Sequence, residues 1–102
     1  MIGKLLEPLA MLASEECKRA REEYGEKYSS PHEGFGILCE EVQEAEDEVK
    51  AVRRDLSYLL RAIRHGEPMD ALLSEVRMDA LSGAAELLQV AAVCEKMMEV
   101  GI

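Results

Sequence analysis

Residues 33–65 read EGFGILCEEVQEAEDEVKAVRRDLSYLLRAIRH, and this stretch decides the fold. Its apolar residues recur in alternating steps of three and four positions: Phe35, Leu38, Val42, Ala45, Val49, Val52, Leu56, Leu59 and Ile63. This spacing is typical of an α-helix that turns one continuous apolar stripe toward a core. We therefore predict a single long helix over residues 33–65, with the stripe facing inward.

Acidic side chains follow the same predicted helix beside the stripe. Glu41, Glu44 and Glu48 each lie about 100° around the helix from a stripe position, because an α-helix has ~3.6 residues per turn. Acids on a solvated face usually alternate with basic partners, yet no Lys or Arg occurs between Lys27 and Lys50. A solvated acidic face is the simpler interpretation, and the missing basic residues weigh against it. The pattern favours a divalent cation beside the core.

The composition limits the classes of protein to consider. At 102 residues the chain is predicted to form one domain, residues 1–102, with one core. Leu, Ala, Val, Met and Glu dominate, which is typical of an all-α fold. The net charge of −9 argues against nucleic-acid binding, which needs clustered Lys and Arg. No apolar run approaches the ~18 residues of a membrane span.

The cysteines and the first residues indicate a compartment. Cys17, Cys39 and Cys94 form no CxxC pair and leave one thiol without a partner. We expect free thiols in a reducing cytoplasm. Glu7 and Pro8 come too early for a signal peptide, which favours the same location.

Two further helices are predicted around the central one. Residues 4–23 have an imperfect apolar face, and Pro8 favours an ordered start near Glu7, because proline fits a first turn better than an interior. A loop over residues 24–32 follows, in which Gly25 ends the first helix. Ser30 is the expected N-cap of the next helix, with Pro31 as its first residue and Glu33 in a capping box.

The segment His65-Gly66-Glu67-Pro68 predicts a second turn, and residues 69–100 a third helix. Its expected core stripe is Met69, Leu73, Val76, Ala80, Gly83, Leu87, Ala91 or Val90, Cys94 and Met98. A polar line runs along the same helix: Glu75, Asp79, Ser82, Glu86 and Gln89. The last two lie in an otherwise apolar run, and a buried charge is kept only if it is paired or bound.

The turn at residues 65–68 predicts an antiparallel hairpin and fixes its register. Glu44 then reaches the level of Gln89, and Asp47 the level of Glu86, because both helices rise equally per residue. Carboxylates gathered inside a helical bundle are suited to Mg²⁺ or Mn²⁺, which prefer oxygen ligands. A helix of ~50 Å also exceeds what a compact monomer with a radius of gyration of ~13 Å can cover, which favours a homodimer or a higher homo-oligomer.

The motif Glu40-Glu41-Val42-Gln43-Glu44, followed one helix later by Glu86-Leu87-Leu88-Gln89, resembles a paired family signature. The signature, EExxE and then ExxD, is that of MazG-like all-α nucleoside triphosphate pyrophosphohydrolases. The likeness covers roughly residues 24–97 and is especially to the short single-domain members encoded by bacteria and phages. It implies a MazG-like helical bundle, a long antiparallel hairpin plus an N-terminal helix, completed by dimerisation.

The resemblance also implies an activity: hydrolysis of a nucleoside triphosphate to a monophosphate and pyrophosphate. By position, Glu41, Glu44 and Glu86 would hold Mg²⁺ (or Mn²⁺), and Glu40 or Glu48 would orient the attacking water. Gln89 stands where the family has Asp and would be a weaker ligand through its carbonyl oxygen. Three basic residues would contact the substrate: Lys27 and His32 in the 24–32 loop, and Lys96 near the end of the third predicted helix.

A second hypothesis remains beside the enzyme. The chain could be a non-catalytic helical dimer that binds a nucleotide or a protein partner. Gln89 favours this alternative because it removes a negative charge from the metal site, whereas the unpaired acids favour the enzyme.

Overall fold

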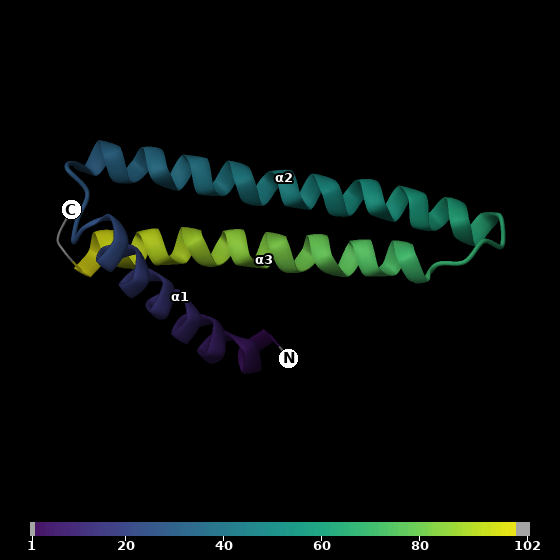
Figure 1. Cartoon of the computed structure of the whole chain (residues 1–102), viewed down its shortest axis with the longest axis horizontal. Helices are drawn as coiled ribbons and strands as arrows, with labels where there is room; N and C mark the ends of the chain where they lie inside the picture. Colours follow the sequence, from purple (N-terminus) through teal and green to yellow (C-terminus); the bar gives the residue numbers. More distant parts are fainter. Residues whose placement is uncertain (1, 100–102) are drawn as a thin grey trace.

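The computed structural model describes residues 2–99, which form three α-helices and no strand. They are α1 (Ile2–Tyr24), α2 (Pro31–Arg64) and α3 (Asp70–Glu99). Figure 1 shows α2 and α3 as a long antiparallel hairpin, with α1 crossing beside the C-terminal half of α3. The all-α prediction and the three helices are confirmed, while residue 100 of the third predicted helix lies outside the described residues.

The start of α2 is fixed by side-chain capping. Ser30 is the N-cap, and its Oγ accepts a hydrogen bond of 3.1 Å from the backbone N–H of Glu33. The Glu33 carboxylate in turn accepts from Ser29, from the backbone N–H at 3.0 Å and from Oγ at 2.9 Å. The predicted capping box is thus present, with its return bond displaced by one residue. These bonds satisfy amide groups that a helix start leaves unpaired.

Glycines end α1 and α2, as predicted. Gly25 has φ 106° and donates to the carbonyl of Arg21 at 2.9 Å. Gly66 has φ 64°, and the following Glu67 N–H reaches back to the carbonyl of Ala62 at 2.9 Å. This left-handed glycine with a backward bond is a Schellman motif, which satisfies the last carbonyls of α2. The chain can therefore reverse sharply into α3.

The face that α2 turns toward α3 differs from the predicted stripe: five of the nine stripe positions are shifted by one residue. Leu38, Ala45, Val52 and Leu59 are buried or half-buried, as predicted. The other inner positions are each one residue earlier than expected: Gly34, Glu41, Glu48, Asp55 and Ala62. The remaining stripe residues are exposed on the outside of the hairpin: Phe35, Val42, Val49, Leu56 and Ile63. The expectation that the whole stripe faces this chain's core is therefore wrong.

Helix α3 shows the same shift. Val76, Gly83 and Val90 are half-buried, but six predicted core positions are exposed: Met69, Leu73, Ala80, Leu87, Cys94 and Met98. The places of the middle four are taken in the interior by the residues immediately before them: Leu72, Asp79, Glu86 and Val93. Gly34 approaches α3 closely, since a Cβ there would overlap the end of the Met97 side chain, whereas a Cβ at Gly83 would make an ordinary contact of 3.4 Å with Cβ of Glu48. Acidic residues consequently occupy the interior of the hairpin.

Few large side chains are buried among residues 2–99. The buried hydrophobic residues in this range are small, apart from one valine: Ala13, Cys17, Ala45, Ala62, Ala92 and Val93. The molecule is elongated, 55 × 28 × 22 Å with a radius of gyration of 17.2 Å, against ~13 Å for a compact chain of this length. The hairpin is thus a long, thin unit with apolar side chains left on its outside.

Helix α1 packs against α3 through its C-terminal half. Ala13 and Cys17 are buried there, and Ser14 donates a hydrogen bond of 2.8 Å to Glu95. The expected start near Glu7 is wrong, because α1 begins at Ile2 and includes Pro8. Proline removes one helical bond, and its ring crowds the carbonyl of Lys4 one turn earlier; both effects fall within the exposed segment of residues 2–12.

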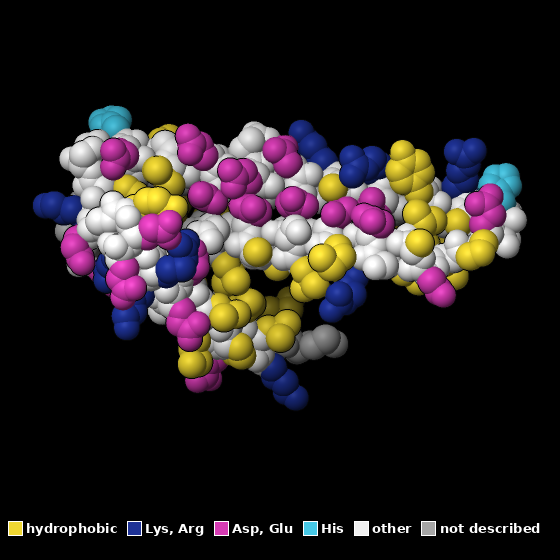
Figure 2. Space-filling model, viewed as in Figure 1, with side chains coloured by type: hydrophobic (Ala, Val, Ile, Leu, Met, Phe, Trp, Pro, Cys, Tyr) yellow, Lys and Arg dark blue, Asp and Glu magenta, His cyan; other side chains and the backbone are white. Residues whose placement is uncertain are grey.

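Toward its N-terminus α1 diverges from α3 and leaves an apolar groove (Figure 2). The groove is lined by side chains of both helices: Leu6, Leu9, Ala10, Ala13, Ala84, Leu87, Leu88 and Ala91. Among the residues described, no helix is both long and apolar enough to cross a membrane.

Candidate metal centre

Three carboxylates meet where the middle of α2 faces α3. Glu41 and Glu44 come from α2 and Glu86 from α3, and each offers a carboxylate oxygen within 4.8 Å of the others. We call these residues the acidic cluster. Figure 2 shows Asp and Glu side chains gathered along the seam between α2 and α3. The hairpin register thus brings together the three acids that the sequence singled out.

The cluster is electrostatically unfavourable without a counter-charge. The pKa of Glu86 is raised by a hydrogen bond with Glu44, by burial and by the charges of the neighbouring glutamates. Burial raises the pKa of Glu41, and the charges of Glu44 and Glu40 raise it further. The neighbouring negative charges therefore oppose the ionisation of Glu41 and Glu86. A bound cation would reverse this effect, so the donor set fits a hard divalent ion.

Of the two residues predicted to orient the attacking water, one lies inside the hairpin and the other on its surface. Glu48 is half-buried one heptad after Glu41, and its charge is among those that raise the pKa of Glu86. Glu40 is exposed and acts on Glu41 through its charge. Glu48 therefore belongs to the interior beside the cluster, whereas Glu40 lies on its outer margin.

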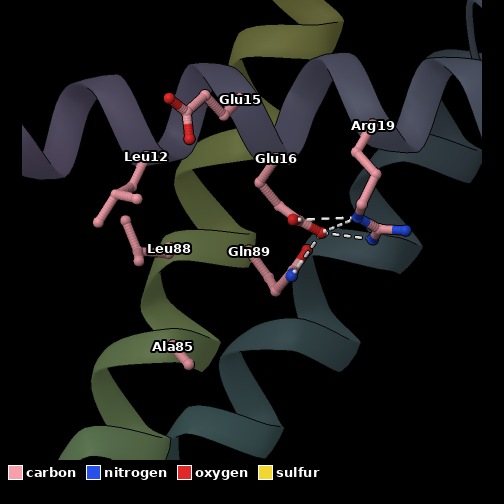
Figure 3. Close-up of a pocket in the computed structure, with 7 residues that line it drawn as sticks. All are labelled: Leu12, Glu15, Glu16, Arg19, Ala85, Leu88 and Gln89. Atoms are coloured by element: carbon pink, nitrogen blue, oxygen red, sulfur yellow. Dashed lines mark hydrogen bonds and ion pairs between the residues drawn. The ribbon is translucent and has the colours of Figure 1, made fainter.

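Gln89 is engaged by a residue of α1. Its Nε2 donates a hydrogen bond of 2.9 Å to Oε1 of Glu16 (Figure 3). Glu16 also accepts from Nε of Arg19 at 3.0 Å, and these two contacts lower the pKa of its carboxyl group. The side-chain carbonyl of Gln89 keeps its acceptor capacity, so its role as a metal ligand stays a prediction.

The sequence patterns singled out no functional residue in the first helix, so Glu16 and Arg19 were missed as candidates. One signal could have found Glu16: the strict apolar register of this helix falls on Glu16 and not on Cys17. An acid at such a position needs a partner within the fold. No comparable pattern marks Arg19, because surface helices often carry arginine.

A cavity of about 310 Å³ adjoins the acidic cluster. Its lining combines aromatic, basic and acidic side chains with aliphatic ones: Arg19, Ala20, Tyr24, Tyr28, Ile37, Glu41, Gln89, Val93 and Lys96. Lys96 is only 3% exposed, and its Nζ lies 4.2 Å from the ring centroid of Tyr28, a cation–π contact. Because Glu41 belongs to both, a ligand in this cavity would reach the acidic cluster.

The predicted substrate residues separate into two groups. Lys96 lines the cavity, whereas Lys27 and His32 are exposed and do not line it. His32 instead borders a separate surface hollow with Pro31 and Phe35. Lys96 is therefore the buried basic residue of the cavity that adjoins the acidic cluster, whereas Lys27 and His32 lie on the surface.

Comparison of this chain with family models, curated proteins and solved structures gives no match. The functional assignment therefore depends on the residues and geometry described above.

Proposed function

We propose that this chain is a nucleoside triphosphate pyrophosphohydrolase that uses Mg²⁺ or Mn²⁺, of the MazG-like type. The observation that carries the proposal is the convergence of Glu41, Glu44 and Glu86 beside a cavity that contains a buried lysine. Hard cations bind carboxylate oxygens, and triphosphates are bound by such cations together with basic side chains.

The residues of the cavity fit the parts of a nucleotide. Lys96 and Arg19 supply positive charge for phosphate oxygens, and Tyr24 and Tyr28 supply aromatic surface for a base. A cation held by the cluster would neutralise charge on the phosphates and favour ionisation of the attacking water. Glu48, inside the hairpin beside the cluster, would accept a proton from that water. Exposed Glu40 would contribute through the field around Glu41.

The functional unit is proposed to be a homodimer. The exposed half of the α2 stripe repeats every seven residues, as does the exposed column of α3 that includes Leu73 and Leu87. Such columns fit helices of matching period and length, and a second copy of this chain supplies them. A helical bundle of two chains would cover the apolar surface that a thin hairpin leaves outside.

The cellular setting follows from the chemistry of the side chains. Cys17, Cys39 and Cys94 are free thiols, which fits a reducing cytoplasm. The net charge of −9 supports a cation-bound nucleotide, and not nucleic acid, as the partner.

A pyrophosphate-release screen tests the enzyme. The full chain is incubated with each common nucleoside triphosphate, with Mg²⁺ and with excess EDTA. We expect pyrophosphate and monophosphate from at least one nucleotide, only with the metal, and none from Glu44→Gln. Release of orthophosphate in place of pyrophosphate, or metal-independent turnover, would contradict the proposal.

One observation favours a second candidate, a nucleotide-binding module without catalysis. Gln89 is neutral, and its amide is directed to Glu16 on α1. If the screen yields no product, equilibrium dialysis with Mg²⁺ and labelled nucleotide distinguishes a binding module from a chain that does not bind nucleotides.

A further inference from the structure

A second pair of facing acids lies farther along the hairpin. Asp55 on α2 is two heptads after Glu41, and Asp79 on α3 is one heptad before Glu86. The same interior column therefore carries both sets of acids. Asp55 is only 6% exposed, and Asp79 is half-buried.

The Asp55 carboxylate is not satisfied by the protein. Its Oδ2 is buried and has no hydrogen-bond partner. The carboxyl group lies close enough to that of Asp79 to share a hydrogen bond, and this contact, burial and the charge of Asp79 raise its pKa. Glu75, one turn before Asp79, adds negative charge, and Arg54 beside Asp55 offsets part of it. No ion pair joins Asp55 to a basic group within residues 2–99.

A shared proton does not resolve this arrangement. It would leave one negative charge on a buried pair that Glu75 flanks and that no ion pair among residues 2–99 compensates, which is costly. A cation between the two groups can take oxygens from both and complete its shell with water, as Mg²⁺ and Mn²⁺ commonly do.

We propose that Asp55 and Asp79 bind a hard divalent cation at a structural site separate from the acidic cluster. Asp55 follows Glu44 by eleven positions, which corresponds to ~16 Å along a helix. Metal ions that act together in catalysis lie ~4 Å apart, so this second ion would hold the hairpin together and take no part in hydrolysis. The proposal stands independently of the proposed activity.

Counting Mn²⁺ ions tests it. The full-length chain is titrated with Mn²⁺, and the free ion is measured by electron paramagnetic resonance. We expect Asp55→Asn and Asp79→Asn each to bind one ion fewer per chain than the parent protein. Glu44→Gln should also lose one ion and keep the one at Asp55, and the double variant Asp55→Asn with Glu44→Gln should lose both. Asp70→Asn, which removes an exposed acid at the start of α3, serves as the charge-matched control and should bind as the parent does.

The stoichiometry separates the possible outcomes. Circular dichroism first establishes that each variant is helical, and removal of a buried acid by an amide preserves the side-chain volume. If Asp55→Asn and Asp79→Asn bind as many ions as the parent, the proposal is overturned, even if they melt at a higher temperature, because relief of repulsion alone then explains the pair. If Asp55→Asn loses an ion while Glu44→Gln binds as many ions as the parent, the proposed catalytic metal centre is refuted and the site at Asp55 stands.

Discussion

Glu44 on α2 and Glu86 on α3 face each other across the hairpin, with their carboxyl groups close enough to share a hydrogen bond. Two acids in this position need either a proton or a cation between them. Glu41 completes a set of three within 4.8 Å, and three carboxylates cannot be satisfied by one shared proton. The stability of the hairpin should therefore depend on both pH and metal ions, and each dependence can be measured.

The first prediction concerns metal-induced stabilisation. A cation that binds only the folded chain stabilises it by ~2.7 kcal/mol when present at about 100 times its Kd. For a domain of this size that corresponds to a rise in melting temperature on the order of 10 °C. We expect Glu44→Gln to lose most of this rise in Mg²⁺, as measured by thermal circular dichroism. The exposed Glu46→Gln serves as control, and an unchanged rise in Glu44→Gln would mean that Glu44 is not a ligand.

The second prediction concerns pH in the absence of metal. The pKa of Glu86 lies above its ordinary value of 4.5, so between that value and the raised one the folded chain binds more protons than the unfolded chain. Stability then falls as pH rises through this window. We expect the fall in melting temperature as pH rises above 4.5, measured in EDTA, to be smaller in Glu86→Gln.

Asp55 and Glu41 contribute in the same direction, since their pKa values are also raised. Some of the fall should therefore remain in Glu86→Gln. Saturating Mg²⁺ should reduce the fall in the parent protein, because the cation takes the place of the proton. An identical pH dependence in parent and variant would show that Glu86 is not held protonated in the fold.

The third prediction concerns assembly. Val49 and Leu56 are 51% and 48% exposed on the outer column of α2. If a second copy covers this column, Val49→Lys would bury a charge in the interface and shift the chain to monomer. Analytical ultracentrifugation should show a dimer for the parent and a monomer for Val49→Lys. The neighbouring exposed Lys50→Glu should remain a dimer. A monomeric parent protein at micromolar concentration would refute the proposed assembly.

Much of the fold could be predicted from the sequence because its signals are local. Gly25, Ser30 and Gly66 mark helix ends, and seven-residue periodicity marks long helices. Periodicity does not distinguish between two adjacent faces that differ by one residue. The hairpin places Glu41 and Asp55 inside where Val42 and Leu56 were expected. That choice depends on how the two helices pack against each other and on what covers their outer faces, and the periodicity of a single helix does not encode either.

The candidate site was predictable in part for the same reason. The hairpin register follows from the turn, so the approach of Glu86 to the acids of α2 could be foreseen. The exact pairing could not: Glu86 meets Glu44, whereas Asp47, expected at its level, is exposed. The contacts of α1 could not, because its crossing of α3 is set by tertiary packing and not by a short turn. Glu16 and Arg19 were therefore recognised only from the structure. Lys27, which was predicted to contact the substrate, is exposed and does not line the cavity.

The fourth prediction compares two lysines. Lys96 is buried in the cavity beside Tyr28, whereas Lys27 is exposed and outside it. Lys96→Met keeps an aliphatic side chain of similar length and removes the charge that would face phosphate. We expect it to raise the KM for the nucleotide at least tenfold, and Lys27→Met to leave KM unchanged. Steady-state pyrophosphate release measures both, and equal effects from the two variants would show that the cavity is not the substrate site.

The last prediction concerns Gln89, the position at which the MazG-like signature has Asp. Carboxylate is the better ligand for a hard cation, so Gln89→Asp should tighten Mg²⁺ binding if residue 89 faces the metal. The structure adds an opposing effect: the substitution removes the hydrogen bond to Glu16 and sets two acids near each other. Without Mg²⁺ the variant should therefore melt below the parent. With saturating Mg²⁺ it should recover, and pyrophosphate release should rise at low metal concentration.

Two controls separate a metal ligand from a packing residue at this position. Gln89→Asn keeps the neutral amide at the length of Asp, so it reports the cost of shortening alone. Adding Glu16→Gln to Gln89→Asp removes the acid that would repel the new carboxylate. We expect this double variant to show the tightest Mg²⁺ binding by isothermal titration calorimetry. If Gln89→Asp remains destabilised at saturating Mg²⁺, and the double variant binds Mg²⁺ no more tightly than the parent, residue 89 is directed toward α1 and the metal site ends at Glu86.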